Sequence, residues 1–375
     1  MKILILTQPL IENYGGILQN YALQTVLKRK GHSVDTLDVE IPLSLLKRYV
    51  RRALSIIKQL FLFLTGKNHN GLIRQWMTRR EKHICYNRIS AFIKAQISTT
   101  PLVTDISELH KYGDYDAYIV GSDQVWRESY SPCLPVYFLN FLPENCKAKR
   151  ISYAASFGSA VLDLPQKKVD EYAGLLQRFD AVSVREPSGK ILCKTELDVD
   201  ADVVPDPTML LSAGDYHCLT GEYSDCAKGK LVTYILDETT QKNRVINKFA
   251  EENNLEIIRL RGTYNLKDLK SAAPEKAGVD FWLGAMESAD YVITDSFHGT
   301  VFSLIFQREF FVFVNHARGK ERFDMLDEKF GIQSRFIDTT ADGIKLQSSL
   351  NYDDIAKKLE QYRLVGGAFL QRAGM

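Results

Sequence analysis

A strand, a turn, a helix and a second strand follow one another between residues 291 and 314, and this order limits the chain to few folds. Residues 291–294 and 310–314 are short runs rich in β-branched and aromatic side chains, as is typical of buried strands. Residues 300–306 between them have the length and apolar content of one buried helix. Strands joined through a helix run parallel, so the stretch predicts an α/β fold.

The turn DSFHG at residues 295–299 contains the first candidate functional residue, His298. Its imidazole is expected where the carboxyl end of a strand meets the first N–H groups of a helix. Ligands bind at such strand ends in open α/β sheets, and helix N-termini attract anions. Asp295, Ser296 and Gly299 flank His298 in the same turn. A histidine that only caps the helix or completes the core fits the same pattern.

The start of the chain predicts a Rossmann-like unit. An apolar strand at residues 2–7 is followed by a turn with Asn13, Gly15 and Gly16, a helix at 17–30 and a strand at 33–39. The turn lacks the G-x-G-x-x-G spacing of a dinucleotide site. Its paired glycines either let the backbone approach a ligand or only permit the turn.

Polar side chains follow three further predicted strands, at residues 116–120, 150–155 and 181–184. They are Ser122 and Asp123, then Ser156, then Arg185. Residues 211–229 show little periodicity and predict a linker, after which strands and helices start afresh. We expect two tandem Rossmann-like domains with a cleft between them. The first spans residues 1–210 with a basic helical insertion at about 44–110, and the second spans 211–375 with a terminal helix.

Charge and cysteine usage exclude several classes of protein. The 375 residues carry a net charge of +2, which gives no global electrostatic case for nucleic acid. The six cysteines form no CxxC pair or metal-ligand spacing, so we expect reduced thiols, no metal and a cytoplasmic protein. The first residues lack the features of a signal peptide.

Residues 44–88 carry eleven Lys or Arg against one acid, Glu81. Their apolar run at residues 60–64 is far shorter than the ~20 residues of a membrane span. The segment predicts either a basic amphipathic insertion in peripheral contact with an anionic membrane, at its inner face, or a solvated helical hairpin packed on the domain.

Six motifs in order give the chain a family resemblance: NYGGILQNYALQ, YIVGSDQVW, YAASFG, SVRE, VPDPT and ITDSFHGT. From about residue 2 to residue 330 the chain resembles the polysaccharide pyruvyl transferases. The resemblance implies a GT-B-like fold and transfer of the pyruvyl group of phosphoenolpyruvate onto two hydroxyls of a sugar, as a cyclic ketal. The acceptor implied is a cell-surface polysaccharide or its polyprenyl-diphosphate-linked precursor. No metal or organic cofactor is implied.

The resemblance also assigns residues. The family's histidine falls on His298, its first-domain arginine on Arg185, and a basic residue beyond the next strand on Lys320, with Arg318 and Arg322 close enough to compete. Members of the family carry an arginine where this chain has Ser296. Binding of the same donor would therefore require another guanidinium, such as that of Arg261 or Arg318.

The chemistry expected of these residues follows from the donor. Phosphoenolpyruvate carries about three negative charges, which suits basic side chains at a helix N-terminus. An imidazolium at His298 suits protonation of its methylene carbon, while Arg185 and Lys320 hold donor oxygens. The plainer interpretations are an interdomain salt bridge for Arg185 and a solvated loop lysine for Lys320. The candidate substrate-binding residues are Asn13, Gly15, Gly16, Ser122, Asp123, Ser156, Ser296, Gly299 and Arg318.

Two other functions fit the same scaffold. One is a GT-B glycosyltransferase that uses a nucleotide sugar, because a fold does not fix a function. The other is a non-catalytic glycan-assembly protein, which would keep its binding when His298 is replaced.

Overall fold

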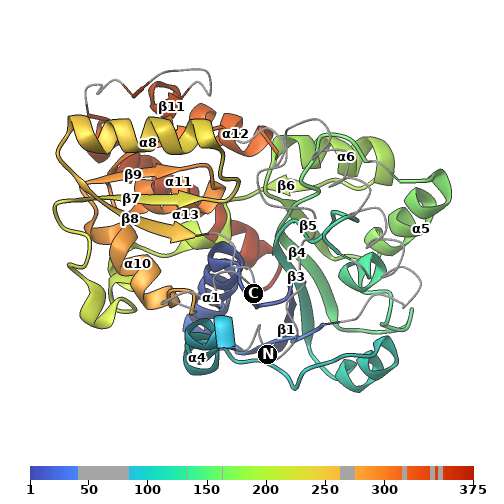
Figure 1. Cartoon of the computed structure of the whole chain (residues 1–375). Helices are drawn as coiled ribbons and strands as arrows, with labels where there is room; N and C mark the ends of the chain where they lie inside the picture. Colours follow the sequence, from blue (N-terminus) through green and yellow to red (C-terminus); the bar gives the residue numbers. More distant parts are fainter. Residues whose placement is uncertain are drawn as a thin grey trace, which may run out of the picture.

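Two parallel β-sheets, each covered by helices, make up the computed structural model of the chain (Figure 1). The structure describes residues 1–40, 84–131, 133–162, 164–261, 275–314, 319–337, 343–344 and 349–375. Most of the predicted basic segment, residues 44–83, and the candidate Arg318 lie outside these residues.

The first sheet has the strand order β2-β1-β3-β4-β5-β6, and every neighbouring pair is parallel. Its strands are β1 (Lys2–Leu6), β2 (Ser33–Thr36), β3 (Ala117–Asp123), β4 (Lys149–Ala155), β5 (Ala181–Val184) and β6 (Asp202–Val203). The helices of this half are α1 (Tyr14–Arg29), α4 (Asn87–Gln96), α5 (Gln166–Leu176) and α6 (Pro187–Leu197), with short 3₁₀ helices η1 (Ile106–Tyr112), η2 (Leu134–Phe138) and η3 (Pro207–Leu210).

The second sheet has the order β11-β10-β9-β7-β8 and is also parallel. Its strands are β7 (Lys230–Ile235), β8 (Glu256–Arg261), β9 (Tyr291–Thr294), β10 (Glu309–Phe313) and β11 (Phe336–Ile337). The helices of this half are α7 (Ala213–His217), α8 (Thr240–Glu252), α10 (Val279–Ser288), α11 (Phe297–Ile305), α12 (Glu321–Phe330) and α13 (Tyr352–Arg372), with η4 (Gly221–Tyr223) and η6 (Gln333–Arg335). Two Rossmann-like domains confirm the expected α/β, GT-B-like fold class.

Helix α11 begins earlier than its apolar run predicts. Ser296 is the N-cap, and its Oγ accepts a hydrogen bond from the N–H of Gly299 at 3.4 Å. This contact draws Phe297 and His298 into the first helical turn. The predicted helix start at residue 300 was therefore three residues late. The expectation that His298 lies where the end of a strand meets the start of a helix is confirmed.

The predicted linker at residues 211–229 is also structured. Ser212 caps α7 in a capping box with Asp215, so the polar residues that suggested a loop are those that start a helix. Leu211 and Tyr216 are buried in the core of the second half. The chain thus passes between the domains through packed structure.

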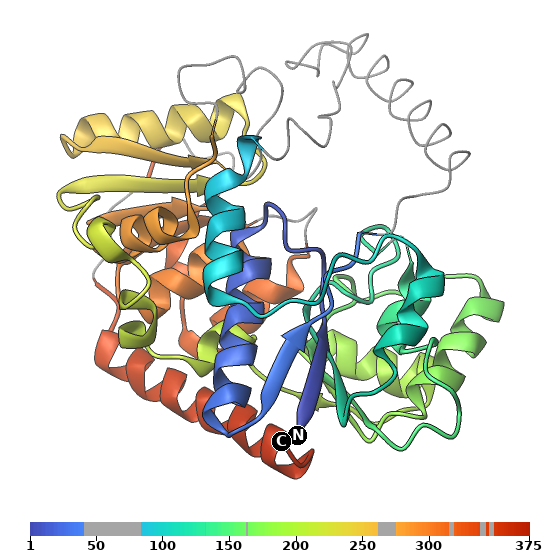
Figure 2. The same cartoon turned by 90° about the horizontal axis from the view of Figure 1, so that it is seen from below.

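Helix α1 lies between the two halves of the molecule (Figures 1 and 2). Its Tyr14 stacks on Trp282 of α10 with ring centroids 5.5 Å apart, and the Tyr14 hydroxyl donates to the carbonyl of Ala277 at 2.7 Å. Ile17 and Leu18 are completely buried in the same cluster as Trp282. One apolar core therefore joins the first domain to the second.

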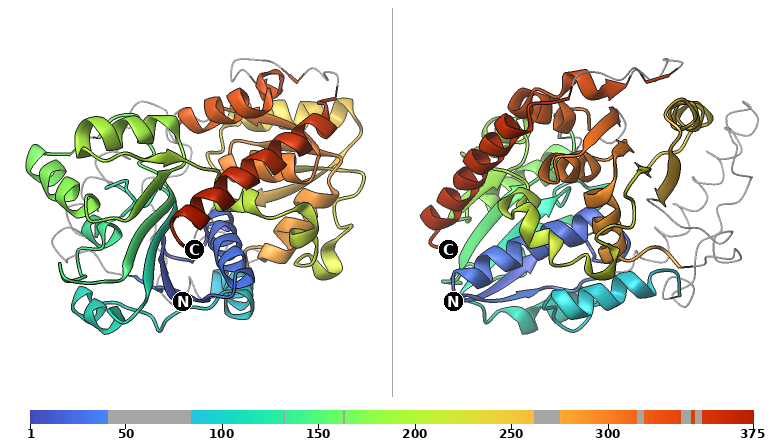
Figure 3. Two further views of the ribbon diagram at one scale, coloured as in Figure 1. Left: turned by 180° about the vertical axis from the view of Figure 1, so that it is seen from behind. Right: turned by 90° about the vertical axis from the view of Figure 1, so that its left-hand side faces the viewer.

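Helix α13 starts on the second domain and ends on the first (Figure 3). Its Phe369 and Leu370 pack in one buried cluster with Ile3 and Ile5 of β1. The terminal helix was expected to belong to the second domain alone, but its C-terminal part packs on the first. Among the helices that the structure describes, none is long and apolar enough to cross a membrane.

We predict opposite effects for alanine at the two adjacent glycines of α13. A Cβ at Gly366 would lie 2.4 Å from Tyr153 Oη and 2.6 Å from Leu210 Cδ2, whereas one at Gly367 would meet nothing within 4 Å. Gly366→Ala should lower the free energy of unfolding by about 1–3 kcal/mol through overpacking. Gly367→Ala should raise it by up to about 1 kcal/mol through helix propensity. Urea denaturation of both variants measures the difference, and equal effects would contradict this docking of α13.

Candidate active site

A cavity of about 410 Å³ lies where the two domains meet. Both domains contribute to its wall, as expected for a cleft at the carboxyl ends of parallel strands. The lining residues are Gln8, Pro9, Ile11, Glu12, Asn13, Asp123, Gln124, Tyr130, Tyr234, Leu236, Asp295, Ser296, Phe297, His298 and Arg322.

His298 reaches across from the second domain and rests on Gly15 of the first. A Cβ placed on Gly15 would lie 2.0 Å from His298 Nδ1 and 2.3 Å from its Cγ. Only glycine leaves room for the ring at this contact. The paired glycines were expected either to let the backbone approach a ligand or only to permit the turn. Gly15 does allow a close approach, but the group that approaches it is the imidazole of His298 in the same chain.

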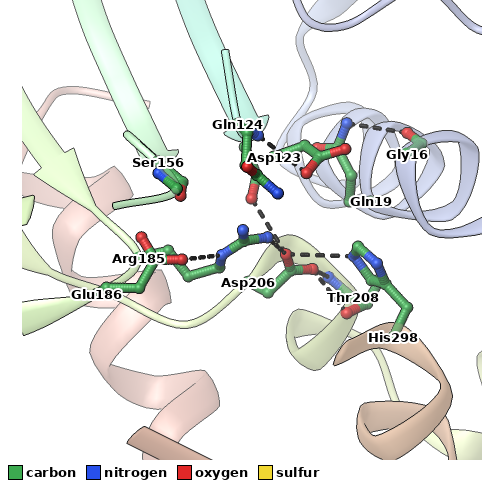
Figure 4. A network of polar contacts seen from close by, with 12 residues as sticks. Gly16, Gln19, Asp123, Gln124, Ser156, Arg185, Glu186, Asp206, Thr208 and His298 are labelled. Atoms are coloured by element: carbon green, nitrogen blue, oxygen red, sulfur yellow. Dashed lines mark hydrogen bonds and ion pairs between the residues drawn. The ribbon is translucent and has the colours of Figure 1, made fainter. Parts of the chain in front are cut away.

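A buried carboxylate, Asp206, stands at the centre of the polar network (Figure 4). Its Oδ2 accepts hydrogen bonds from Arg185 Nη1 at 2.8 Å and Ser122 Oγ at 3.1 Å, and it lies 3.5 Å from His298 Nε2. Its Oδ1 accepts from the N–H and the hydroxyl of Thr208, at 3.0 and 2.7 Å. The 3.5 Å separation is at the outer limit of a hydrogen bond, so this contact is longer than the others that Asp206 makes.

Asp206 remains ionised despite complete burial. Burial raises the pKa of its carboxyl, but the charges of His298 and Arg185 and the hydrogen bonds of the network outweigh this, so the pKa lies well below its usual range. Burial lowers the pKa of Arg185, and the carboxylates of Glu186 and Asp206 raise it by more, so the guanidinium stays charged.

Arg185 lies beneath the cavity, not in its wall. It is completely buried, its Nε donates to Glu186 Oε1 at 2.9 Å, and its guanidinium lies 4.7 Å from the ring centroid of Phe297 in the second domain. The sequence placed Arg185 in direct contact with the donor. In the structure its Nε and Nη1 donate to Glu186 and Asp206, because a buried guanidinium requires such partners. Its Nη2 is buried without a hydrogen-bond partner among the described residues, so the expected contact with the donor stays a prediction.

Arg322, not Lys320, is the basic side chain at the cavity. Arg322 lines the cavity, is buried, and lies 5.7 Å from the Phe297 centroid on the ring that Arg185 also contacts. Burial, followed by the charge of Arg185, lowers the pKa of Arg322 to about 10, so it is charged at neutral pH. Lys320 is half-exposed, forms an ion pair with Asp324 and does not line the cavity. The prediction that Lys320 faces His298 is corrected accordingly.

Asp123 and Asn13 meet at the cavity, as their positions in the sequence suggested. Asn13 Nδ2 donates to Asp123 Oδ2 at 3.1 Å, and the N–H of Gln124 donates to Oδ1 at 2.9 Å. Asp123 has a φ of +67°, in the left-handed region that costs a non-glycine residue about 1–3 kcal/mol. Such strain persists where surrounding structure enforces it, and here it turns a carboxylate towards the cavity.

The other candidates have structural tasks. Ser122 holds Asp206, and Ser156 is buried with its Oγ accepting from the N–H of Gly158 at 3.0 Å. Gly299 allows α11 to pack on β9, because a Cβ there would lie 2.3 Å from Thr294 Oγ1. The carbonyl of Gly16 accepts from Gln19 Nε2 at 2.9 Å inside α1. Of this group of side chains only Ser296, the cap of α11, is in the cavity wall.

Asp295 is not the carboxylate that faces His298. Its Oδ2 accepts from Lys242 Nζ at 2.7 Å, and its Oδ1 accepts from the N–H of Leu236 at 2.6 Å. These contacts tie the end of β9 to α8 and β7. Within the part of the chain that the structure describes, no group of three or more His, Cys, Asp or Glu side chains is placed to hold a metal ion.

The family model of the polysaccharide pyruvyl transferases matches residues 13–317. The chain belongs to this family. No curated protein matches the sequence. Solved structures of similar chain path include the UDP-GlcNAc 2-epimerase of Methanocaldococcus jannaschii, with 12% identity, coverage of 97% of this chain and 93% of that chain, and a TM-score of 0.46. An α-glucosyltransferase solved with UDP and DNA has 12% identity, coverage of 100% and 93%, and a TM-score of 0.47.

The sequence did not reveal the role of Asp206, and it favoured Lys320 over Arg322 as the basic residue of the site. Asp206 follows β6 between two prolines, so it carries the same signal as the other polar residues at strand ends. Arg322 was named as a competitor of Lys320, but a linear sequence does not tell which side of a helix start faces inward.

We predict that Gly15→Ala displaces the imidazole of His298, because a methyl group cannot occupy the space that the ring fills. The free energy of unfolding should fall by about 1–3 kcal/mol, and the His298 ring signals in NMR spectra should move. Gly174→Ala in α5 is the matched control, because a Cβ there meets nothing within 4 Å. If Gly15→Ala leaves both stability and the His298 signals unchanged, the domains do not close in solution as described.

Proposed function

We propose that this member of the family transfers the pyruvyl group of phosphoenolpyruvate onto two hydroxyls of one sugar and forms a cyclic ketal. The observation that carries the proposal is the pairing of His298 with Arg322 in the wall of one interdomain cavity. Proton transfer and anion binding are the two tasks that this chemistry requires.

Electrostatics favour an anionic donor at this position. Two helices begin at cavity-lining residues, α1 at Asn13 and α11 at Ser296. The side chain of Asn13 makes no capping hydrogen bond to α1 because it is turned to Asp123. Helix N-termini carry partial positive charge, and Arg322 adds a full one. Arg322 thus takes the place of the guanidinium that Ser296 does not supply.

The residues of the cavity can balance the reaction. His298 gives a proton to the methylene carbon of phosphoenolpyruvate, the double-bond electrons form the new C–H bond, and the neighbouring carbon becomes electrophilic. A sugar hydroxyl attacks that carbon and passes its proton to the Asp123 carboxylate, and this proton returns to His298 before the next turnover, which restores both groups. A second hydroxyl of the same sugar then displaces phosphate, which leaves with the remaining proton. The net products are the ketal and inorganic phosphate.

His298→Ala should lower kcat by about 10²- to 10⁴-fold, the usual contribution of a general acid, while affinity for phosphoenolpyruvate changes less. Mass spectrometry of lipid-linked oligosaccharides incubated with phosphoenolpyruvate and enzyme measures the added pyruvyl ketal. Near-normal kcat in His298→Ala would remove this residue from the reaction. A product with a transferred sugar from a nucleotide donor would instead support the glycosyltransferase alternative.

Arg322→Ala and Lys320→Ala form a matched pair two residues apart. Because only Arg322 lines the cavity, its loss should raise KM for phosphoenolpyruvate by tenfold or more, at ~1.5–3 kcal/mol for a charge-assisted hydrogen bond. Lys320→Ala should change KM less than about twofold, because its ammonium is paired with Asp324 outside the cavity. The reverse result would return the donor-binding role to Lys320.

We propose further that the acceptor is lipid-linked and that the basic segment 44–88 draws the enzyme to the inner face of an anionic membrane. The support is its charge, at ~1 kcal/mol for each Lys or Arg near such a surface. In vesicle sedimentation the protein should partition onto anionic vesicles and be released by salt. Equal partitioning onto neutral vesicles would contradict membrane attraction by charge.

A further inference from the structure

We propose that Asp206 is a positioning residue for His298: it holds the Nε2–H of the imidazole, so that Nδ1 is the nitrogen that faces the substrate. This proposal rests on the proposed function for its kinetic part, but the tautomer it assigns is a property of the free protein.

The assignment follows from the surroundings of the two ring nitrogens. Nε2 is completely buried, has no hydrogen-bond partner at ordinary distance among the described residues, and points at Asp206 Oδ2 3.5 Å away. A lone pair on Nε2 would face the negative oxygen and be repelled by it, so the proton of the neutral ring belongs on Nε2. Nδ1 lies beside Gly15 in the first turn of α1. Because His298 lines the cavity and Nε2 is directed at Asp206, we assign the substrate to the Nδ1 side of the ring.

Asp206 is itself rigidly held. Its other oxygen is fixed by the N–H and hydroxyl of Thr208, and Oδ2 is fixed by Arg185 and Ser122. Its side chain is completely buried and cannot turn away without breaking its ion pair with Arg185 Nη1. The carboxylate therefore sets the orientation of a ring that comes from the other domain.

The arrangement fits a proton donor. When His298 is doubly protonated, transfer of the Nδ1 proton to the methylene carbon breaks one N–H bond and forms one C–H bond. The ring that remains is the neutral Nε2–H tautomer, which is the form that Asp206 binds. The contact between Asp206 and the Nε2–H thus persists through the step, and only Nδ1 changes its protonation.

The first test needs neither a substrate nor a variant of Asp206. Long-range ¹H–¹⁵N spectra of histidine-labelled protein distinguish a protonated from an unprotonated ring nitrogen, and His298→Gln identifies the signals among the seven histidines. In alkaline buffer we expect His298 to carry its proton on Nε2. A neutral ring with the proton on Nδ1 would overturn the proposal, whether or not the protein proves to be a pyruvyl transferase.

The second test compares Asp206→Asn with Ser122→Ala. Both change a contact to the same oxygen, but only the first removes the charge that faces His298. Asp206→Asn should lower kcat at least about tenfold with KM for phosphoenolpyruvate little changed, whereas Ser122→Ala should keep kcat within about threefold. Equal losses in the two variants would show that Asp206 acts only through folding. If Asp206→Asn does not fold, the tautomer measured in the wild-type protein decides.

Discussion

The ion pair between Arg185 and Asp206 is the contact on which the arrangement of the site depends, because both side chains are completely buried. Taking two charges out of water costs several kcal/mol each, which only close partners offset. Each member therefore needs further contacts: Glu186 and Phe297 for the guanidinium, Ser122 and Thr208 for the carboxylate. These requirements draw the ends of several strands of the first sheet to one point below the cavity.

The second domain contacts this group of buried charges through close packing and through electrostatic attraction. Phe297 and His298 are consecutive residues of α11, and they contact Arg185 and Asp206 respectively. Gly15 lets the imidazole come close, while Tyr14 beside it stacks on Trp282. These two neighbouring residues of α1 have different roles. Tyr14 fixes the distance between the domains, and Gly15 leaves room for the imidazole of His298. Packing of α13 on both domains limits their relative movement further.

The guanidiniums of Arg185 and Arg322 both lie against the ring of Phe297. Of the two, Arg322 lines the cavity. Arg185 is paired with carboxylates of its own domain. Burial and the nearby charge of Arg185 lower the pKa of Arg322, and Glu186 and Asp123 raise it by less. A cation under such repulsion gains from any anion that enters beside it. The absence of an arginine at position 296 is therefore compatible with an anionic donor, since Arg322 of helix α12 supplies the positive charge.

The sequence by itself determined the two Rossmann-like halves, the positions of most strands along the chain and the candidates His298, Asp123 and Asn13, because local periodicity and strand-end position report on short-range structure. It also supplied the motifs that place the chain in its family. Only the tertiary structure decided that Asp206 meets His298, that α13 crosses to the first domain, and that Arg185 is buried beneath the cavity. These contacts join residues about a hundred or more positions apart, or on different domains, and no local pattern encodes them. A difference of two positions in the sequence is enough to change a side chain's surroundings. Side chains two residues apart on a helix are rotated by about 200° about its axis, so packing places Arg322 inside and leaves Lys320 outside.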